Sequence, residues 1–170
     1  MVFSFAYRQP SFLTLVRITT PVGAVADRPF VSATLRGRKA PPRTFTDVLV
    51  DTGSAVTVFP IAFAGLLGVT LQGRTRIQWR GNWFDMHYGD VDIELRDDVG
   101  YVLAWTARVG FSLAKMRYQL LGQRGALEFF NAMFRGGSRD LLLELEPNSD
   151  FAGQAFDPQG NTVSLHGAGT

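Results

Sequence analysis

The chain has 170 residues, 46% of them hydrophobic and 19% charged, so it is long and apolar enough to bury the core of one globular domain. Its net charge is only +2 and its basic residues are scattered singly, which argues against nucleic acid as a partner. The absence of cysteine excludes disulfides and thiol chemistry, and two distant histidines supply neither a histidine metal site nor a Ser-His-Asp triad.

Two segments bear on cellular location. The N-terminal sequence MVFSFAYRQPSF lacks a basic leader and a small-residue cleavage site, so no signal peptide is expected. Residues 52–73 carry no charged side chain, but they contain Pro60 and several glycines. A buried strand followed by a short helix explains this stretch better than a membrane span does. The expectation is a soluble, cytoplasmic protein with no membrane partner.

Alternating apolar and polar residues predict a mainly β chain. Strands are expected, in chain order, at residues 29–35, 45–50, 55–59, 76–79, 83–88, 91–95, 101–109, 118–121 and 139–145. A β-bulge is expected at Gly89, where the alternation changes register. One short helix is expected over residues 60–67, with Pro60 in its first turn, and another over residues 126–134, where apolar residues recur at helical spacing.

The pattern divides the chain into three parts. Residues 1–28 form an N-terminal segment without a clear pattern, apart from a candidate strand at residues 13–18. Residues 29–147 carry the predicted strands and form the domain proper. Residues 148–170 are rich in glycine and show no period, so they are expected to be a loose C-terminal tail. No internal repeat is visible.

The sequence VLVDTGSAV, residues 48–56, places Asp51 at the end of a strand that otherwise appears buried. An isolated charge in apolar surroundings is costly, so such a carboxylate is paired, protonated or functional. Gly53 lets the chain turn sharply and so holds the carboxylate at the end of a rigid strand. Ser54 is placed to donate a hydrogen bond to the carboxylate, which favours the charged form. A turn in which Asp51 merely caps the backbone is the alternative interpretation.

A second motif, Leu120-Leu121-Gly122, follows further along the chain and precedes the predicted helix over residues 126–134. Between the two motifs lies a predicted hairpin whose turn is Arg80-Gly81-Asn82. This ensemble, spanning roughly residues 29–146, resembles the retroviral-type (retropepsin-like) aspartic proteases and their bacterial relatives. The resemblance implies a mainly β, closed acid-protease barrel with a flap hairpin and one short C-terminal helix, one lobe per chain.

The resemblance also assigns roles to residues. Asp51 is the implied catalytic residue, supported by Thr52, Gly53 and Ser54, and the hydroxyl of Thr52 reaches across to a partner loop. The implied flap and substrate-binding residues are Trp79, Arg80, Gly81, Asn82 and Trp83. The substrate is a peptide or protein, and neither a cofactor nor a metal is required. The aromatic residues at the hairpin tip are equally consistent with packing on their own barrel.

The family mechanism needs two facing carboxylates that share one proton, but this chain has one Asp-Thr-Gly. Without an internal repeat, the second carboxylate is expected from a second copy, which predicts a homodimer with Asp51 at the twofold axis. The alternative function is a dimerisation or peptide-binding module of the same fold with little or no catalysis.

The sequence departs from the viral pattern at two positions that pair with each other there. Ala55 stands where an acidic residue is common, and Gln123 stands where an arginine is common. Substrate-end recognition and dimer stabilisation are therefore expected to differ from the viral case. The apolar run over residues 141–145 fits either a core strand or a dimer strand.

Overall fold

The computed structural model describes residues 1–8, 28–79, 81–135 and 141–165, and this part of the chain is mainly β. One α-helix occurs among these residues, α1 (Ile61–Leu67). The strands are β1 (Phe3–Ala6), β2 (Phe30–Arg36), β3 (Arg43–Val50), β4 (Val58–Pro60), β5 (Gln72–Trp79), β6 (Asn82–Arg96), β7 (Val102–Ser112), β8 (Gln119–Leu121), β9 (Phe130–Arg135), β10 (Leu142–Pro147), β11 (Gln154–Phe156) and β12 (Thr162–Val163).

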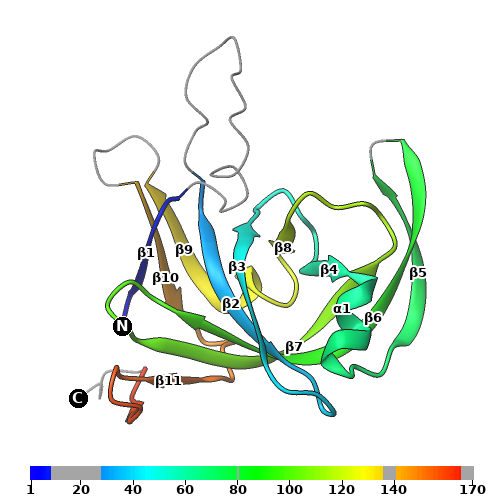
Figure 1. Cartoon of the computed structure of the whole chain (residues 1–170). Coiled ribbons are helices and arrows are strands. Elements are labelled where there is room, and N and C mark those ends of the chain that lie inside the picture. Colours follow the sequence, from blue (N-terminus) through cyan, green and yellow to red (C-terminus); the bar gives the residue numbers. More distant parts are fainter. Residues whose placement is uncertain (9–27, 80, 136–140, 166–170) are drawn as a thin grey trace, which may run out of the picture.

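Six strands close into a barrel (Figure 1). The order around it is β7-β4-β8-β3-β2-β6, and β6 pairs again with β7 to complete the ring. Strand β8 runs parallel to β3 and antiparallel to β4. The core lies inside the ring, where alternate residues of each strand are fully buried, among them Leu35, Val48, Ile93 and Phe111. The predicted closed, mainly β barrel is confirmed at this level of detail.

Strand β6 is one continuous strand, so the expected bulge at Gly89 is wrong. Gly89 pairs in register with Val109, and the irregularity lies instead on the neighbouring strand, between Gln72 and Arg74. Gly73, at that irregularity, has φ of 70°, a conformation that glycine adopts without strain. A Cβ on Gly89 would lie 2.4 Å from the side chain of Val69. This glycine therefore allows close packing rather than a change of register.

Helix α1 confirms the short helix predicted after Pro60. Pro60 precedes the first helical residue, where its missing N–H and fixed φ are harmless. Gly68 ends the helix in the left-handed conformation, with φ of 64°, and its N–H donates to the carbonyl of Gly65. Ala64 and Leu67 are buried, so the helix packs its apolar face against the core of the barrel.

The predicted helix over residues 126–134 is wrong, and this corrects the expected C-terminal helix. Only a 3-10 turn forms there, Leu127–Phe129, and the chain then extends as β9. The extended form lets β9 pair with β10 along its whole length, which satisfies its backbone groups on that side. Phe130 packs edge to face on Trp105, so the aromatic spacing reflects contacts in a strand rather than a helical face.

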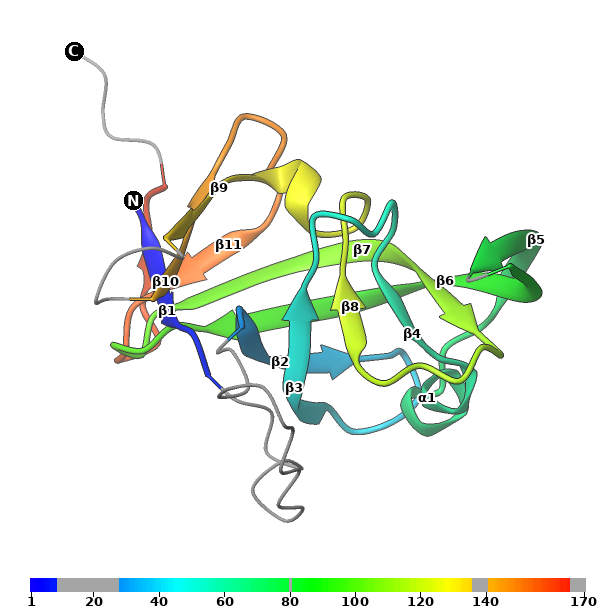
Figure 2. The same ribbon diagram turned by 90° about the horizontal axis from the view of Figure 1, so that it is seen from above.

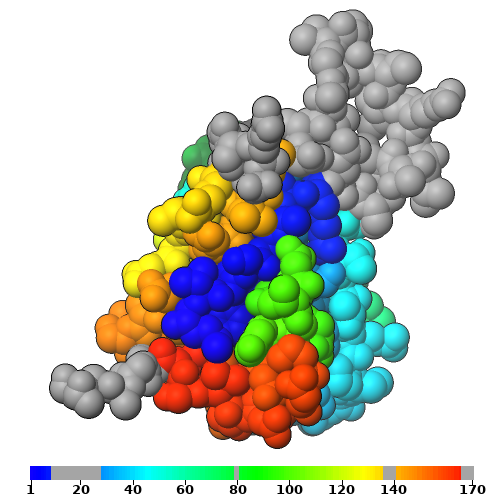
Figure 3. Space-filling view, turned by 90° about the vertical axis from the view of Figure 1, so that its left-hand side faces the viewer, coloured from blue at the N-terminus to red at the C-terminus, as the bar shows by residue number. Residues whose placement is uncertain are grey.

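Strands β1, β10 and β9 form a second, three-stranded sheet with β10 in the middle. Leu143 and Leu145 of β10 are buried, as are Phe3 and Phe5 of β1. Of the two interpretations of residues 141–145, the core strand is therefore the one observed. Figure 3 shows β1 (blue) packed between this sheet's other strands and the turn that joins β6 to β7 (green).

The segment expected as a loose tail is ordered on the barrel as far as residue 165. Strand β11 pairs with β7, and β12 pairs with β11. Phe151 is buried, and its ring contacts those of Trp105 and Phe130. Residues 166–170 lie outside the described part of the chain, as does the candidate strand at residues 13–18. No helix within the described ranges is long and apolar enough to cross a membrane.

Candidate active site

The two sequence motifs meet at one end of the barrel. Strand β3 leads into Asp51, the chain turns through residues 52–57, and it returns as β4. Strand β8, which carries Leu120 and Leu121, lies between β3 and β4 and pairs with both. The loop that bears Asp51 therefore arches over the end of β8, and the second motif forms the base on which the first is held.

Backbone hydrogen bonds fix this loop at four points. The N–H of Asp51 donates to the carbonyl of Leu121 at 3.0 Å. Further along, the N–H of Gln123 donates to the carbonyl of Ser54 at 2.8 Å, and the N–H of Arg124 donates to the carbonyl of Ala55 at 3.1 Å. The N–H of Thr57 returns a bond to the carbonyl of Arg124 at 2.8 Å. The Asp51 loop is thus paired almost continuously with the segment that follows β8, which gives its carboxylate a rigid support.

Gly122 occupies a position with no room for a side chain. A Cβ there would lie 2.3 Å from the carbonyl oxygen of Val56 and 2.8 Å from that of Ser54. The N–H of Gly122 donates to the hydroxyl oxygen of Thr57, which is fully buried, at 3.1 Å. The glycine of the second motif is therefore required because the Asp51 loop crosses directly over it.

Asp51 is partly exposed in the single chain. One of its oxygens, Oδ1, accepts a hydrogen bond from the N–H of Gly53 at 2.9 Å. The carbonyl of Asp51 also accepts the N–H of Ser54 at 3.1 Å. The carboxylate therefore caps its own turn, as the alternative interpretation supposed, while it still faces the adjoining pocket.

Ser54 uses its hydroxyl differently from what the sequence suggested. The hydroxyl of Ser54 donates to the carbonyl of Val56 at 2.7 Å, so the expected donation to the Asp51 carboxylate is wrong. The backbone geometry explains this result, because the carbonyl of Val56 lies two residues on, within easy reach of a serine side chain. Thr52 is exposed, and its carbonyl accepts the side-chain amide of Gln123 at 3.1 Å. Gln123 thereby braces the loop that carries Asp51.

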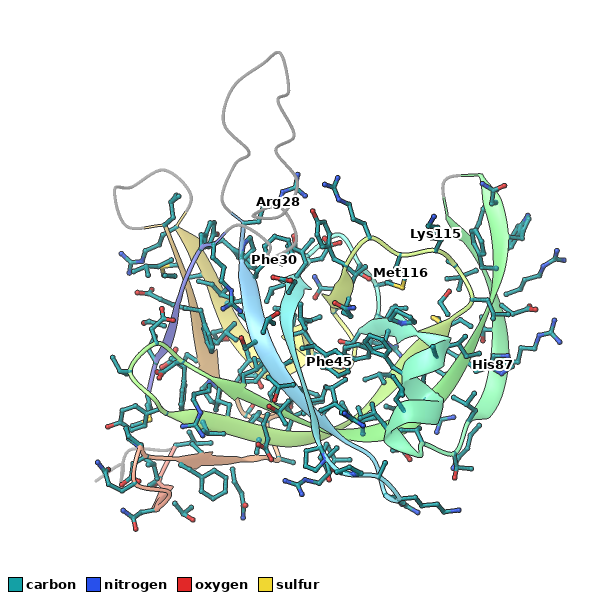
Figure 4. All side chains as sticks on the ribbon, in the orientation of Figure 1. Arg28, Phe30, Phe45, His87, Lys115 and Met116 are labelled. Atoms are coloured by element: carbon teal, nitrogen blue, oxygen red, sulfur yellow. The ribbon has the colours of Figure 1, made fainter. Side chains whose placement is uncertain are left out.

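A pocket of 440 Å³ opens beside Asp51. Its walls come from the Asp51 loop, the β5–β6 hairpin, and the segments around β7 and β8. Figure 4 shows Met116 on the segment between β7 and β8, between the Asp51 loop and the hairpin. Apart from Asp51 itself, the lining is largely apolar and consists of Gly53, Ser54, Ala55, Val56, Val58, Ile77, Gln78, Met86, Ser112, Ala114, Met116 and Leu120. This composition suits an apolar side chain placed next to a carboxylate.

The predicted hairpin is present, and Trp79 pairs with Asn82 across its turn. Gly81 in the turn has φ of 78°, which glycine adopts without strain. Residue 80 and the side chain of Trp79 lie outside the described part of the structure. Trp83 is 55% exposed, and the Cζ atom of Arg76 lies over its ring, 5.6 Å from the ring centre. Trp83 does not line the pocket described above. From the hairpin it is Ile77, Gln78 and Met86 that reach the pocket.

No group of three or more His, Asp or Glu side chains is arranged to hold a metal ion in the ranges that the structure describes. No protein-family model matches the chain, and no curated protein matches it either.

Several residues of this site were not singled out from the sequence. Thr57 is a polar residue in the middle of the apolar strand predicted over residues 55–59, which was a usable signal, because a buried hydroxyl must find a partner. Met86 and Met116 carried no such signal, because an apolar residue in a strand or loop is usually part of the core. Their role becomes visible only when the barrel brings the hairpin and the segment after β7 to the same pocket.

Proposed function

We propose that this protein is an aspartic endopeptidase that hydrolyses peptide bonds with a pair of Asp51 carboxylates contributed by two copies of the chain. The observation that supports it most directly is the interlocking of the Asp51 loop with Gly122 beside an apolar pocket. A carboxylate on a loop that backbone hydrogen bonds hold at four points, facing a pocket of 440 Å³, is suited to activating water next to a bound peptide.

In the proposed reaction the two carboxylates share one proton, because two like charges so close cannot both ionise readily. The ionised carboxylate takes a proton from a water molecule, which attacks the carbonyl carbon of the peptide bond. The protonated carboxylate donates a hydrogen bond to the carbonyl oxygen as negative charge develops there. The C–N bond then breaks as the leaving amine takes the proton that the first carboxylate received from water, and no covalent enzyme intermediate forms. The Gly53 N–H that donates to Oδ1 holds one carboxylate oxygen in place during these transfers.

The accessibility of the loop supports the contribution of a second copy. Asp51 is only partly buried, and Thr52, Gly53 and Ala55 are exposed. A second copy related by a twofold axis can therefore approach the loop and complete the pair of carboxylates with one isologous contact. The hairpin formed by β5 and β6 borders the same pocket and is the proposed flap over the substrate.

One observation favours a second candidate function, a peptide-binding or dimerisation module without catalysis. The Asp51 carboxylate already serves a structural purpose, because it accepts the N–H of Gly53 in its own turn. An apolar pocket alone is sufficient to bind a peptide side chain. The two candidates differ in whether the negative charge of Asp51 is needed.

The test is cleavage of a peptide library by purified wild type and by Asp51→Asn over about pH 3 to 8. Asparagine keeps an oxygen that accepts the Gly53 N–H, so the variant should fold normally while hydrolysis is abolished. Asp150→Asn is the matched control, since Asp150 is exposed and does not line the pocket. Substantial turnover by purified Asp51→Asn contradicts the catalytic assignment. Peptide binding without cleavage by the wild type favours the binding module.

A further inference from the structure

Helix α1 presents an apolar face to solvent. Ala62, Gly65 and Leu66 are exposed on it, and Leu66 is 52% exposed. Leu71, four residues after the helix, is 36% exposed as well. A surface helix normally carries charged or polar side chains on the face opposite its buried one. The exposed face of α1 has none, and an apolar surface of this kind marks a site of contact.

The turn that joins β2 to β3 packs against the C-terminal end of α1. A Cβ on Gly37 would collide with the carbonyl oxygen of Leu67, and a Cβ on Gly68 would lie 2.8 Å from the Cβ of Lys39. Figures 1 and 2 both show this turn beside α1. The side chains of the turn therefore border the exposed apolar face of the helix.

The same turn is basic, and most of its charge is uncompensated. Arg36, at its start, pairs with Glu94 at 3.5 Å. Arg38, Lys39 and Arg43 are exposed and form no ion pair or side-chain hydrogen bond with any residue that the structure describes. Three exposed cations beside an apolar face are therefore available to an anionic partner.

The chemistry of this surface fits an anionic membrane better than a soluble anion. Residues 28–46 and 52–84, which build it, contain no aspartate or glutamate to repel anionic headgroups. Cations near an anionic leaflet strengthen attachment, and apolar side chains beside them insert at the boundary between headgroups and acyl chains. A nucleic acid or a soluble phosphate compound would use the cations but would leave Leu66 and Leu71 in water.

We propose that this protein attaches to the surface of anionic membranes through the exposed face of α1 and the β2–β3 turn. A membrane partner was not expected from the sequence, because residues 52–73 do not suit a membrane span, but attachment to a surface needs no span. The basic turn and Asp51 lie at opposite ends of β3. The attached protein would therefore keep the Asp51 pocket open to solvent. The proposal does not depend on what that pocket does.

The first test is co-sedimentation of the full chain with phosphatidylcholine vesicles that contain about 30% phosphatidylserine, compared with phosphatidylcholine alone. We expect binding to the anionic vesicles that weakens as salt is added. Arg38→Gln and Lys39→Gln should each lower the partition coefficient roughly fivefold, and Leu66→Gln should lower it several-fold.

Two matched controls lie elsewhere on the molecule. Lys115→Gln removes the other lysine of the chain, which Figure 4 shows on the segment between β7 and β8, near Met116. Val99→Gln changes a residue of the β6–β7 turn that is 72% exposed. Both should bind the anionic vesicles within about twofold of wild type.

A second measurement tests insertion of the apolar face. The chain has no cysteine, so Leu66→Cys provides a single position for a polarity-sensitive fluorophore. Its emission should shift to shorter wavelength on the phosphatidylserine vesicles, because the label enters the interface, whereas a label on Val99→Cys should not shift.

Melting temperatures measured alongside show that each variant is folded. Binding to anionic vesicles that the α1 and turn variants weaken and the controls do not, with the shift at residue 66, supports the proposal. A wild-type chain that does not bind these vesicles overturns it. Binding that the controls weaken as much, or a label at residue 66 that keeps its emission in water, overturns it as well. Neither measurement depends on hydrolysis, so absence of peptide cleavage counts only against the proposed enzyme.

Discussion

Replacing Gly122 by alanine tests whether the two motifs are interlocked as described. The added Cβ would lie 2.3 Å from the carbonyl oxygen of Val56, whereas a carbon and a carbonyl oxygen normally stay roughly 3.3 Å apart. The nearest atoms on both sides are backbone, so the contact cannot be relieved by rotating a side chain. The loop and the segment after β8 must separate by about 1 Å.

That separation has a calculable effect on stability. Overpacking of this kind costs about 1–3 kcal/mol. Two hydrogen bonds join the same two segments, from Gln123 to Ser54 at 2.8 Å and from Gly122 to Thr57 at 3.1 Å. The separation would weaken both, and each loss costs about 1 kcal/mol of folding stability. The sum is about 3–5 kcal/mol, which lowers the melting temperature of a domain of this size by roughly 6–20 °C.

The measurement is thermal unfolding followed by circular dichroism, with Gly65→Ala as the matched control. A Cβ on Gly65 meets nothing within 4 Å, and the residue lies inside helix α1. The control should therefore raise the melting temperature, because alanine is favoured over glycine in a helix by about 1 kcal/mol. If Gly122→Ala melts within about 2 °C of wild type, the close crossing of the Asp51 loop over Gly122 is incorrect.

Three further predictions follow from the site and its surroundings. Thr57→Val should reduce the free energy of unfolding in urea by about 1–3 kcal/mol, because the N–H of Gly122 loses its buried acceptor, while Thr57→Ser should lose less. In a steady-state assay, Met86→Ala should change the rate of peptide cleavage strongly and Trp83→Ala only slightly, because Met86 lines the pocket and Trp83 does not. A larger effect of Trp83→Ala on the cleavage rate would contradict the pocket assignment. The hydrogen bond from the Asn161 side chain, with backbone N–H donors, holds the pKa of Asp157 below its ordinary value. The ionised Asp157 carboxylate therefore stabilises the fold at pH values above its ordinary pKa, and this stabilisation is lost as the pH falls through the lower pKa of the folded state. Asp157→Ala should melt below wild type near neutral pH and should match it in strong acid.

The barrel could be predicted from the sequence because apolar and polar residues alternate along most of its strands. The runs leading to Asp51 and following residue 101 became β3 and β7 with only small changes in their ends. Helix α1 was predictable for a similar reason, since Pro60 and Gly68 mark its two limits. A contact between the segments that follow the two motifs was suggested only by the family resemblance, because the residues at the positions of Ala55 and Gln123 pair in the viral members.

What the sequence could not supply depends on long-range contacts. Phe130 and Met133 are spaced as on a helix, yet pairing with β10 overrides that preference and makes β9 a strand. Phe151 sits in a glycine-rich stretch, but the rings of Trp105 and Phe130 bury it and order the segment around it. The sequence offered the hydroxyl of Ser54 two acceptors, the Asp51 carboxylate and nearby backbone carbonyls, and only the folded structure shows that it donates to the Val56 carbonyl.

The insertion of β8 between β3 and β4 also determines when, during synthesis of the chain, the site around Asp51 can form. Strands β3 and β4 are close in sequence, but they are joined through β8, which is made much later. During synthesis the Asp51 turn therefore remains without its support until residues 119–124 have left the ribosome, and contacts of such wide sequence separation form slowly. A nascent chain that ends before this point has the Asp-Thr-Gly sequence but lacks the structure that positions it, so the proposed peptide hydrolysis could begin only once most of the chain has been made.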